Sequence, residues 1–325
     1  MAEYREIQGA AVQALANNTG TIKGQIWYDT ANYKFKVESV STAAWATVAN
    51  LPYTTRDASG VGTQTAGVIF GGFPGGVTTA AEWNGTSFTS ATAIPSGVSG
   101  LDSDGPQTAG LTAGGSPGPM NNTSYDYNGS SWTANPTMPV GRTGHATVGN
   151  AAAQTAALAT GGEPGSATGT TSNWNGSTWT VGAANPSWAQ GTSGGGTPSA
   201  AFVNADVNDG DKTHDYDGTS WTAGNNSNNQ HNYGGAGGLA TVGITFGGTQ
   251  VPNPGVRTAQ AERYDGTCWT TDASMNEGRS NVHGKATVSG PAILVAAGNP
   301  GPPGSSNVSE EYTGAGPASL IITTT

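Results

Sequence analysis

Short apolar runs alternate with polar, glycine-rich segments along most of the chain. Four of the runs are QTAGVIFGG (64–72), QTAGLTAGG (107–115), QTAALATGG (154–162) and LATVGITFGG (239–248). A loop follows each run, and then a phrase such as AERYDGTCWT (261–270) places aromatic residues on both sides of an Asn-Gly or Asp-Gly pair. These pairs favour two-residue type I′ turns, in which both central residues take positive φ. The pattern predicts a strand, a loop and a β-hairpin, repeated along the chain.

The repeat has a period of 42 to 48 residues, measured between the aromatic residues that close successive phrases. A second aromatic series stands two residues before the glycine of each turn. Periods of this size in an all-β chain are typical of propeller blades. The closing series is Trp45, Phe88, Trp132, Trp179, Trp221 and Trp269, and the second series is Trp83, Tyr127, Trp174, Tyr216, Tyr264 and Tyr312.

Each period supplies four strands, because a polar segment such as GRTGHATVG (141–149) precedes the apolar run. In a wedge of blades the inner strands favour small residues, and aromatic side chains fill the wider gaps outside. We therefore interpret both aromatic series as packing residues, and the glycine pairs as points of close backbone approach.

Six apolar runs predict an all-β, six-bladed propeller over residues 45–325. The ring closes through the strand around Trp45 or through the tail ASLIITTT (318–325), and seven blades result if the N-terminal hairpin joins the ring. The runs end near Gly72, Gly115, Gly162, Ala205, Gly248 and Gly298.

The first 44 residues lack the repeat and form a separate segment. Residues 4–17 predict a short helix, and GQIWYDTANYKFKV (24–37) alternates around a turn and predicts a β-hairpin. No secretory signal and no run of about 18 apolar residues is present, so we expect a chain made in a cytoplasm and not inserted in a membrane.

Composition excludes several classes of function. The formal charge is −10 with only 11 Lys and Arg, so there is no basic patch for nucleic acid. Cys268 is the single cysteine, which excludes an intramolecular disulfide and a cysteine metal cluster.

The glycine pair and the later Trp, as in SWTANPTMPVGRTGHATVG (131–149), resemble kelch repeats. The N-terminal hairpin, the phrases GTQTAGVIFGG and AAEWNGTSFT, and the closing EYTGAGPASLIITTT resemble kelch-like propeller proteins of marine phages, cyanophages in particular. That resemblance implies a tail-fibre or other virion surface protein, present in multiple copies. It would dock to other virion proteins through residues 1–44 and present the propeller outward.

Few residues stand out as candidate ligand sites. Trp188, His231 and Tyr233 lie in long variable linkers and suit sugar recognition by stacking and hydrogen bonding. Asp206, Asp209 and Asp211 are candidate calcium ligands, because calcium prefers several oxygen donors; a solvated hairpin loop is the alternative. No other cofactor is expected. His145 and His283 stand at comparable places in two repeats and are interpreted as structural.

No catalytic constellation is visible. The expected function is that of a non-enzymatic virion structural protein that adheres to host-surface glycan or takes part in virion assembly. The alternatives are a capsid decoration protein, a protein-binding scaffold, and a carbohydrate enzyme similar to galactose oxidase, in which Cys268 would have to serve the copper site.

Overall fold

The computed structural model describes residues 13–15, 26–116, 120–149, 155–163, 169–186, 190–250, 255–282, 285–286, 292–302 and 304–321. The chain divides into two compact units, one of residues 1–43 with 314–325 and the other of residues 44–313. The described residues contain strands and turns but no α-helix, and none of them lies in a helix long and apolar enough to cross a membrane.

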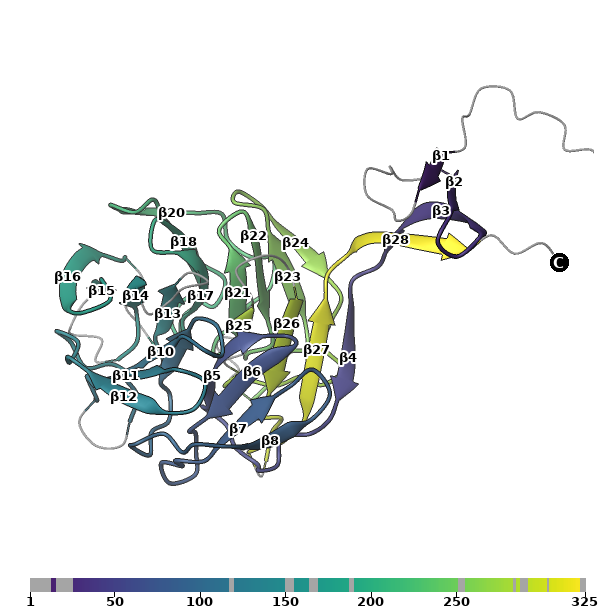
Figure 1. Ribbon diagram of the computed structural model, residues 1–325. Helices are drawn as coiled ribbons and strands as arrows, with labels where there is room; N and C mark the ends of the chain where they lie inside the picture. The colour runs from purple at the N-terminus through teal and green to yellow at the C-terminus, as the bar shows by residue number, and fades with distance from the viewer. Residues whose placement is uncertain are drawn as a thin grey trace, which may run out of the picture. The chain divides into compact units, whose positions relative to one another are not determined.

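The larger unit is a six-bladed β-propeller, as predicted, and each blade is a four-stranded antiparallel sheet (Figure 1). The first three blades are β5 (Ser59–Thr63), β6 (Ala66–Phe70), β7 (Ala80–Trp83) and β8 (Phe88–Ala91); β9 (Asp102–Asp104), β10 (Gly110–Ala113), β11 (Ser124–Tyr127) and β12 (Trp132–Asn135); and β13 (Ala146–Gly149), β14 (Ala157–Thr160), β15 (Thr170–Trp174) and β16 (Trp179–Ala184).

The remaining blades follow the same order until the last. They are β17 (Ser193–Thr197), β18 (Ala200–Asn204), β19 (Thr213–Tyr216) and β20 (Trp221–Ala223); β21 (Gly235–Leu239), β22 (Val242–Phe246), β23 (Ala261–Tyr264) and β24 (Trp269–Asp272); and β25 (Lys285–Ala286), β26 (Ala292–Ala296), β27 (Ser309–Thr313) and β4 (Ala44–Val48).

The N-terminal strand closes the ring. β4 pairs antiparallel with β27, so that Trp45 lies opposite Tyr312 with their ring centroids 5.2 Å apart. Of the two closures left open by the sequence, the structure takes the strand around Trp45. The tail does not extend the propeller, because β28 (Gly316–Ile321) pairs with β3 (Lys34–Ser41) of the smaller unit.

The smaller unit is a four-stranded sheet in the order β1-β2-β3-β28, and it forms no seventh blade. The predicted hairpin is confirmed as β2 (Ile26–Asp29) and β3, joined by a turn that Asp29 caps through the backbone N–H groups of Ala31 and Asn32. The predicted helix is wrong where it is described, because β1 (Gln13–Leu15) is a strand that pairs in parallel with β2. The rest of residues 4–17 lies outside the described residues.

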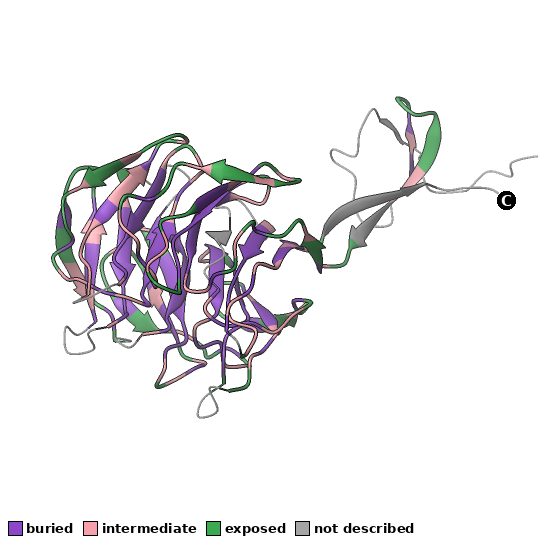
Figure 2. Cartoon of the chain, turned by 90° about the horizontal axis from the view of Figure 1, so that it is seen from below, coloured by how far each residue is buried: buried purple, intermediate pink, exposed green. Residues whose placement is uncertain are grey.

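Packing is tightest at the centre of the ring. The first strands of successive blades lie against one another from β5 round to β25, which lies against β5. A Cβ on Gly195 of β17 would lie 2.8 Å from the carbonyl oxygen of Gly238 in β21, so only glycine fits there. Figure 2 shows buried strands within the propeller and exposed segments around its outside. The inner strand β21 is buried at four of its five residues, whereas the outer strand β12 has no buried residue.

The aromatic series lie between blades and also carry polar contacts. The indole N–H of Trp179 donates to Ser124 Oγ of the preceding blade at 2.9 Å, and those of Trp221 and Trp269 reach threonine hydroxyls in the same way. Ten of the twelve residues are less than a tenth exposed, and Phe88 and Trp132 are half-buried. The ten are Trp45, Trp83, Tyr127, Trp174, Trp179, Tyr216, Trp221, Tyr264, Trp269 and Tyr312.

The hairpin turns differ from the predicted type. In the turn Asn84–Ser87 only Gly85 has positive φ, 92°, so Asn84 precedes the two central residues and is not one of them. The Asn84 side chain instead accepts hydrogen bonds from the backbone N–H groups of Thr86 and Ser87, at 3.0 and 2.9 Å. Asn128, Asn175, Asp217 and Asp265 repeat this arrangement. The Asn or Asp is therefore selected for its side-chain oxygen.

Candidate functional site: an axial pocket

Six residues, one from each blade, form a closed ring of backbone hydrogen bonds around the propeller axis. The N–H of each residue donates to the carbonyl oxygen of its counterpart in the preceding blade, at N···O distances of 2.7 to 3.3 Å. All six have positive φ, between 54° and 83°. The ring residues are Asp57, Gly100, Gly144, Gly191, Tyr233 and Asn281.

Three ring positions are glycine, which adopts this conformation without steric cost, and Asn and Asp tolerate it well. Tyr233, with φ of 54°, is unusual, because a bulky side chain pays about 1–2 kcal/mol for the left-handed region. Its ring lies on the neighbouring glycine, since a Cβ added to Gly191 would lie 3.4 Å from Tyr233 Cδ2. Such backbone outliers concentrate at binding and catalytic sites, so we regard Tyr233 as a functional candidate.

A polar pocket of about 540 Å³ opens at this ring and is lined by five of the six ring residues. Its size lies within the range typical of small-molecule sites. Further side chains come from loops of all six blades and are almost entirely hydrogen-bonding groups. They include Arg56, Ser99, Thr143, Gln190, Arg257 and Asn299.

The Asp57 carboxylate is held from two sides. Asn281 donates its side-chain amide to Asp57 Oδ1, and Arg56 Nε lies 3.5 Å from Asp57 Oδ2. Arg56 is itself fixed by a 2.9 Å hydrogen bond to the carbonyl oxygen of Gly304 and by its guanidinium lying 4.3 Å from the centroid of the Phe73 ring. The carboxylate is thus an oriented hydrogen-bond acceptor at the pocket wall.

The phenol of Tyr233 stays protonated throughout the neutral range. Burial, followed by the negative charges of Glu163 and Asp57, raises the pKa of Tyr233 to about 12. Glu163 accepts a hydrogen bond from the side chain of Gln190, which lines the pocket. Tyr233 therefore lines the pocket with a neutral side chain that keeps its O–H as a hydrogen-bond donor.

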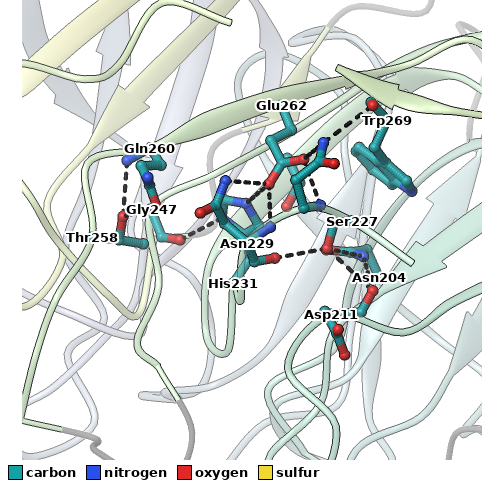
Figure 3. Close-up of polar contacts among 12 residues, drawn as sticks. Asn204, Asp211, Ser227, Asn229, His231, Gly247, Thr258, Gln260, Glu262 and Trp269 are labelled. Atoms are coloured by element: carbon teal, nitrogen blue, oxygen red, sulfur yellow. Dashed lines mark hydrogen bonds and ion pairs between the residues drawn. The ribbon is translucent and has the colours of Figure 1, made fainter. Parts of the chain in front are cut away.

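His231, the second candidate in this linker, does not reach the pocket surface. It is fully buried, with Nδ1 2.8 Å from the carbonyl oxygen of Gly247 and Nε2 3.2 Å from Glu262 Oε1 (Figure 3). Glu262 also accepts hydrogen bonds from the backbone and side-chain amides of Asn228 and Asn229, at 2.6 to 2.9 Å. Burial alone would raise the pKa of Glu262, but the hydrogen bonds from His231 and the two asparagines outweigh it and lower the pKa to about 2.

This network anchors the linker that carries Tyr233. The prediction that His231 contacts a ligand is therefore corrected: it supports the pocket from behind. Arginines stand at the position of His231 in two other blades and also bond to a backbone carbonyl oxygen. Arg142 donates to the carbonyl oxygen of Gly161, and Arg279 donates to that of Ala297. Arg279 also forms a buried ion pair with Glu310 at 2.7 Å.

The three aspartates proposed as calcium ligands have separate structural contacts. Asp206 caps its own turn by accepting from the N–H groups of Asn208 and Asp209, and Asp209 pairs with Lys212 at 2.6 Å. The Asp211 carboxylate accepts from Asn226. Throughout the described part of the chain, no three His, Cys, Asp or Glu side chains are grouped so as to hold a metal ion. Each of the three carboxylates thus has its own protein partner, and calcium binding stays a prediction.

The remaining candidates lie apart from the pocket or outside the described residues. Trp188 and His283 belong to the latter group. His145 is fully buried and packs against Gly114 and Gly162, so its role is in packing. Cys268 is exposed, on a hairpin turn.

Sequence reasoning missed Arg56, Asp57, Arg257 and Asn281. A signal was present at the ring position, which stands two residues before the inner strand in five of the six blades. Superposing the repeats there gives a column of Gly, Asp, Asn and Tyr, which is the composition expected for positive φ, except for Tyr233. That exception would have singled out the site.

Comparison with known proteins supports the fold alone. No family model matches the chain, and no curated protein matches it. The solved structure of YjhT superposes with a TM-score of 0.66 at 14% sequence identity, over 83% of this chain and 99% of the other. The class defined by these observations is a six-bladed β-propeller with a polar axial pocket.

Proposed function

We propose that this chain is a non-enzymatic surface protein of a bacteriophage virion that binds host-surface glycan in the axial pocket. The observation that carries the proposal is the pocket itself, which joins a strained aromatic residue, Tyr233, to a wall of fixed hydrogen-bond donors and acceptors. Sugars present apolar faces and many hydroxyl groups, and such a lining matches both.

The state of Asp57 is consistent with a binding role. Asn281 donates to one of its oxygens and Arg56 lies beside the other. These contacts fix the orientation of the carboxylate, so that its remaining lone pairs can accept hydrogen bonds from sugar hydroxyls.

The hairpin of the smaller unit supports a docking role for residues 1–44. Ile26 and Tyr28 lie directly opposite Val37 and Phe35, which places four apolar side chains on one face. Ile26 is 39% and Phe35 47% exposed, and such a face is suited to another virion subunit. The proposal that the protein belongs to a virion rests on the resemblance of its sequence to marine phage proteins.

The test of glycan binding is calorimetric titration of the full chain with a panel of hexoses, N-acetylhexosamines and uronic acids. Tyr233→Gly should weaken binding about tenfold or more, because it removes the stacking surface. Tyr33→Gly is the matched control: Tyr33 has φ of 55°, is 79% exposed and belongs to the smaller unit. Equal effects of the two substitutions, or no binding by the wild type, would contradict the proposal.

The test of virion location is gold-labelled antibody against residues 45–325 on intact particles. Label on the tail tip or fibres would support adhesion, and label over the capsid would indicate decoration. Absence of label would remove the virion assignment.

A further inference from the structure

Charge around the axial pocket is unevenly distributed. The chain carries a formal charge of −10, yet two of its arginines, Arg56 and Arg257, line this one pocket. Four other basic residues of the propeller have contacts elsewhere: Arg263 pairs with Asp272, Lys212 pairs with Asp209, and Arg142 and Arg279 are buried inside blades.

The two pocket arginines meet on the same loop of the sixth blade. Arg257 Nη2 donates to Asn299 Oδ1 at 3.2 Å, and Arg56 Nη1 donates to the carbonyl oxygen of Gly304. Asp57 offsets the charge of Arg56. Among the described residues, no carboxylate oxygen lies within 4 Å of a side-chain nitrogen of Arg257.

Arg257 also retains unused donor capacity. Its only hydrogen bonds among the described residues are those to Asn299 and to the carbonyl oxygen of Gly255, whereas a guanidinium has five N–H groups. The Nε atom of Arg257 is buried and has no hydrogen-bond partner among the described residues. A guanidinium in this state is suited to a planar, bidentate acceptor such as a carboxylate, or to a phosphate.

The far side of the ring has the opposite character. Glu163 follows β14 of the third blade, and Asn299 follows β26 of the sixth, so the two lie three blades apart. The negative charge of Glu163 contributes to the raised pKa of Tyr233. Glu163 does not itself line the pocket, but it accepts a hydrogen bond from Gln190, which does. An anionic ligand group beside Gln190 would therefore lie close to a carboxylate.

We propose that the axial pocket selects an anionic sugar unit, with its carboxylate or phosphate on Arg257 and its ring hydroxyls towards Tyr233 and Gln190. This inference rests on the proposed glycan binding. It adds that the ligand is negatively charged and that Arg257 recognises this charge. One orientation of the sugar is favoured, because reversal would place the anion beside Gln190, whose side chain is bonded to the carboxylate of Glu163.

The experiment is calorimetric titration of the full chain at neutral pH with glucuronate, galacturonate, their parent hexoses and the hexose 6-phosphates. At least one anionic form should bind about tenfold or more tightly than its parent hexose. Arg257→Gln should abolish that preference while leaving hexose binding in place, and Arg257→Lys should retain part of it. Arg263→Gln, an arginine substitution away from the pocket, should change neither.

The outcomes separate this inference from the proposed function. Equal binding of hexoses and their anionic forms overturns the charge selection but leaves glycan binding intact. Absence of binding by every sugar overturns both. Tighter binding of a hexose 6-phosphate than of a uronate supports the inference and identifies phosphate as the preferred anion. Thermal melting of each variant shows whether it is folded. If Arg257→Gln does not fold, the preference retained by Arg257→Lys still tests the inference.

Discussion

The phenol of Tyr264 donates a 2.8 Å hydrogen bond to the carboxylate of Asp215 in the preceding blade. Tyr127 and Glu82, and Tyr312 and Asp272, form the same link across other blade boundaries. At the boundary between the sixth and first blades, Trp83 uses its indole N–H on Glu311. The repeated aromatic is thus Tyr or Trp because each joins an apolar body to a polar tip.

Loss of one such hydroxyl group should measurably destabilise the propeller. Tyr264→Phe keeps the packing of the aromatic ring but removes the donor to Asp215, whose pKa is already raised by burial. We expect a loss of about 1–2 kcal/mol in the free energy of unfolding, measured by chemical denaturation. Tyr33→Phe, at a 79% exposed residue, should change stability by less than about 0.5 kcal/mol. Equal losses would show that the interblade hydrogen bond contributes nothing.

The ring glycine Gly100 should not tolerate a side chain. At Gly100, with φ of +62°, an added Cβ would collide with Thr143 Oγ1. Gly75 has φ of +80° but nothing within 4 Å of an added Cβ, so it isolates the backbone cost alone. Gly75→Ala should cost about 1–2 kcal/mol of folding free energy, and Gly100→Ala clearly more. Thermal unfolding of the two variants compares them directly, and similar melting temperatures would contradict the prediction.

Acid should weaken the fold through Glu262. Its pKa is lowered from 4.5 to about 2 by the hydrogen bonds that overcome its burial. A lowered pKa in the folded state contributes stability above pH 4.5, and that contribution is lost as the pH falls from 4.5 towards 2. Glu262→Gln should cost about 3–5 kcal/mol at neutral pH and flatten the acid-side decline in stability.

The control for Glu262 is Glu277→Gln, a substitution at a side chain that is 41% exposed. Denaturation curves at pH 7, 4 and 3 for wild type and both variants provide the measurement. An unchanged acid profile in Glu262→Gln would show that another carboxyl group governs acid unfolding.

Ring closure should depend on β4. A fragment of residues 44–313 retains all six blades, whereas a fragment of residues 50–313 lacks β4 and exposes the edge of β27 with Tyr312. The first fragment should be monomeric and unfold cooperatively. The second should aggregate or melt far lower, because it bares both a strand edge and an aromatic side chain. Gel filtration with thermal melting distinguishes them, and equal behaviour would contradict closure through β4.

Periodicity carried the fold prediction, because six copies of one packing arrangement are visible in the sequence as aromatic and glycine positions. Local rules failed where tertiary pairing decided the structure: β1 is a strand because β2 offers it a partner. The turns showed a similar limit, since Asn-Gly fits more than one register around the glycine, and the side-chain oxygen of Asn84 chose between them.

The pocket was only partly predictable. Tyr233 stood out as an aromatic residue in a linker, but Arg56 and Arg257 are about 200 residues apart in the chain. They meet only because the sixth blade closes against the first, and no local pattern records that approach. His231 looked like a ligand-binding residue for the same reason as Tyr233, and only burial separates their roles.

Closure by β4 also determines how the two units are joined. Ala44 and Thr313 are paired directly across β4 and β27, and from each the chain runs on into the sheet that contains β3 and β28. The propeller is therefore tethered by two covalent connections, at residues 42–43 and 314–315. A protease that cuts one of them leaves the other intact, so a single nick cannot release the propeller from its partner unit.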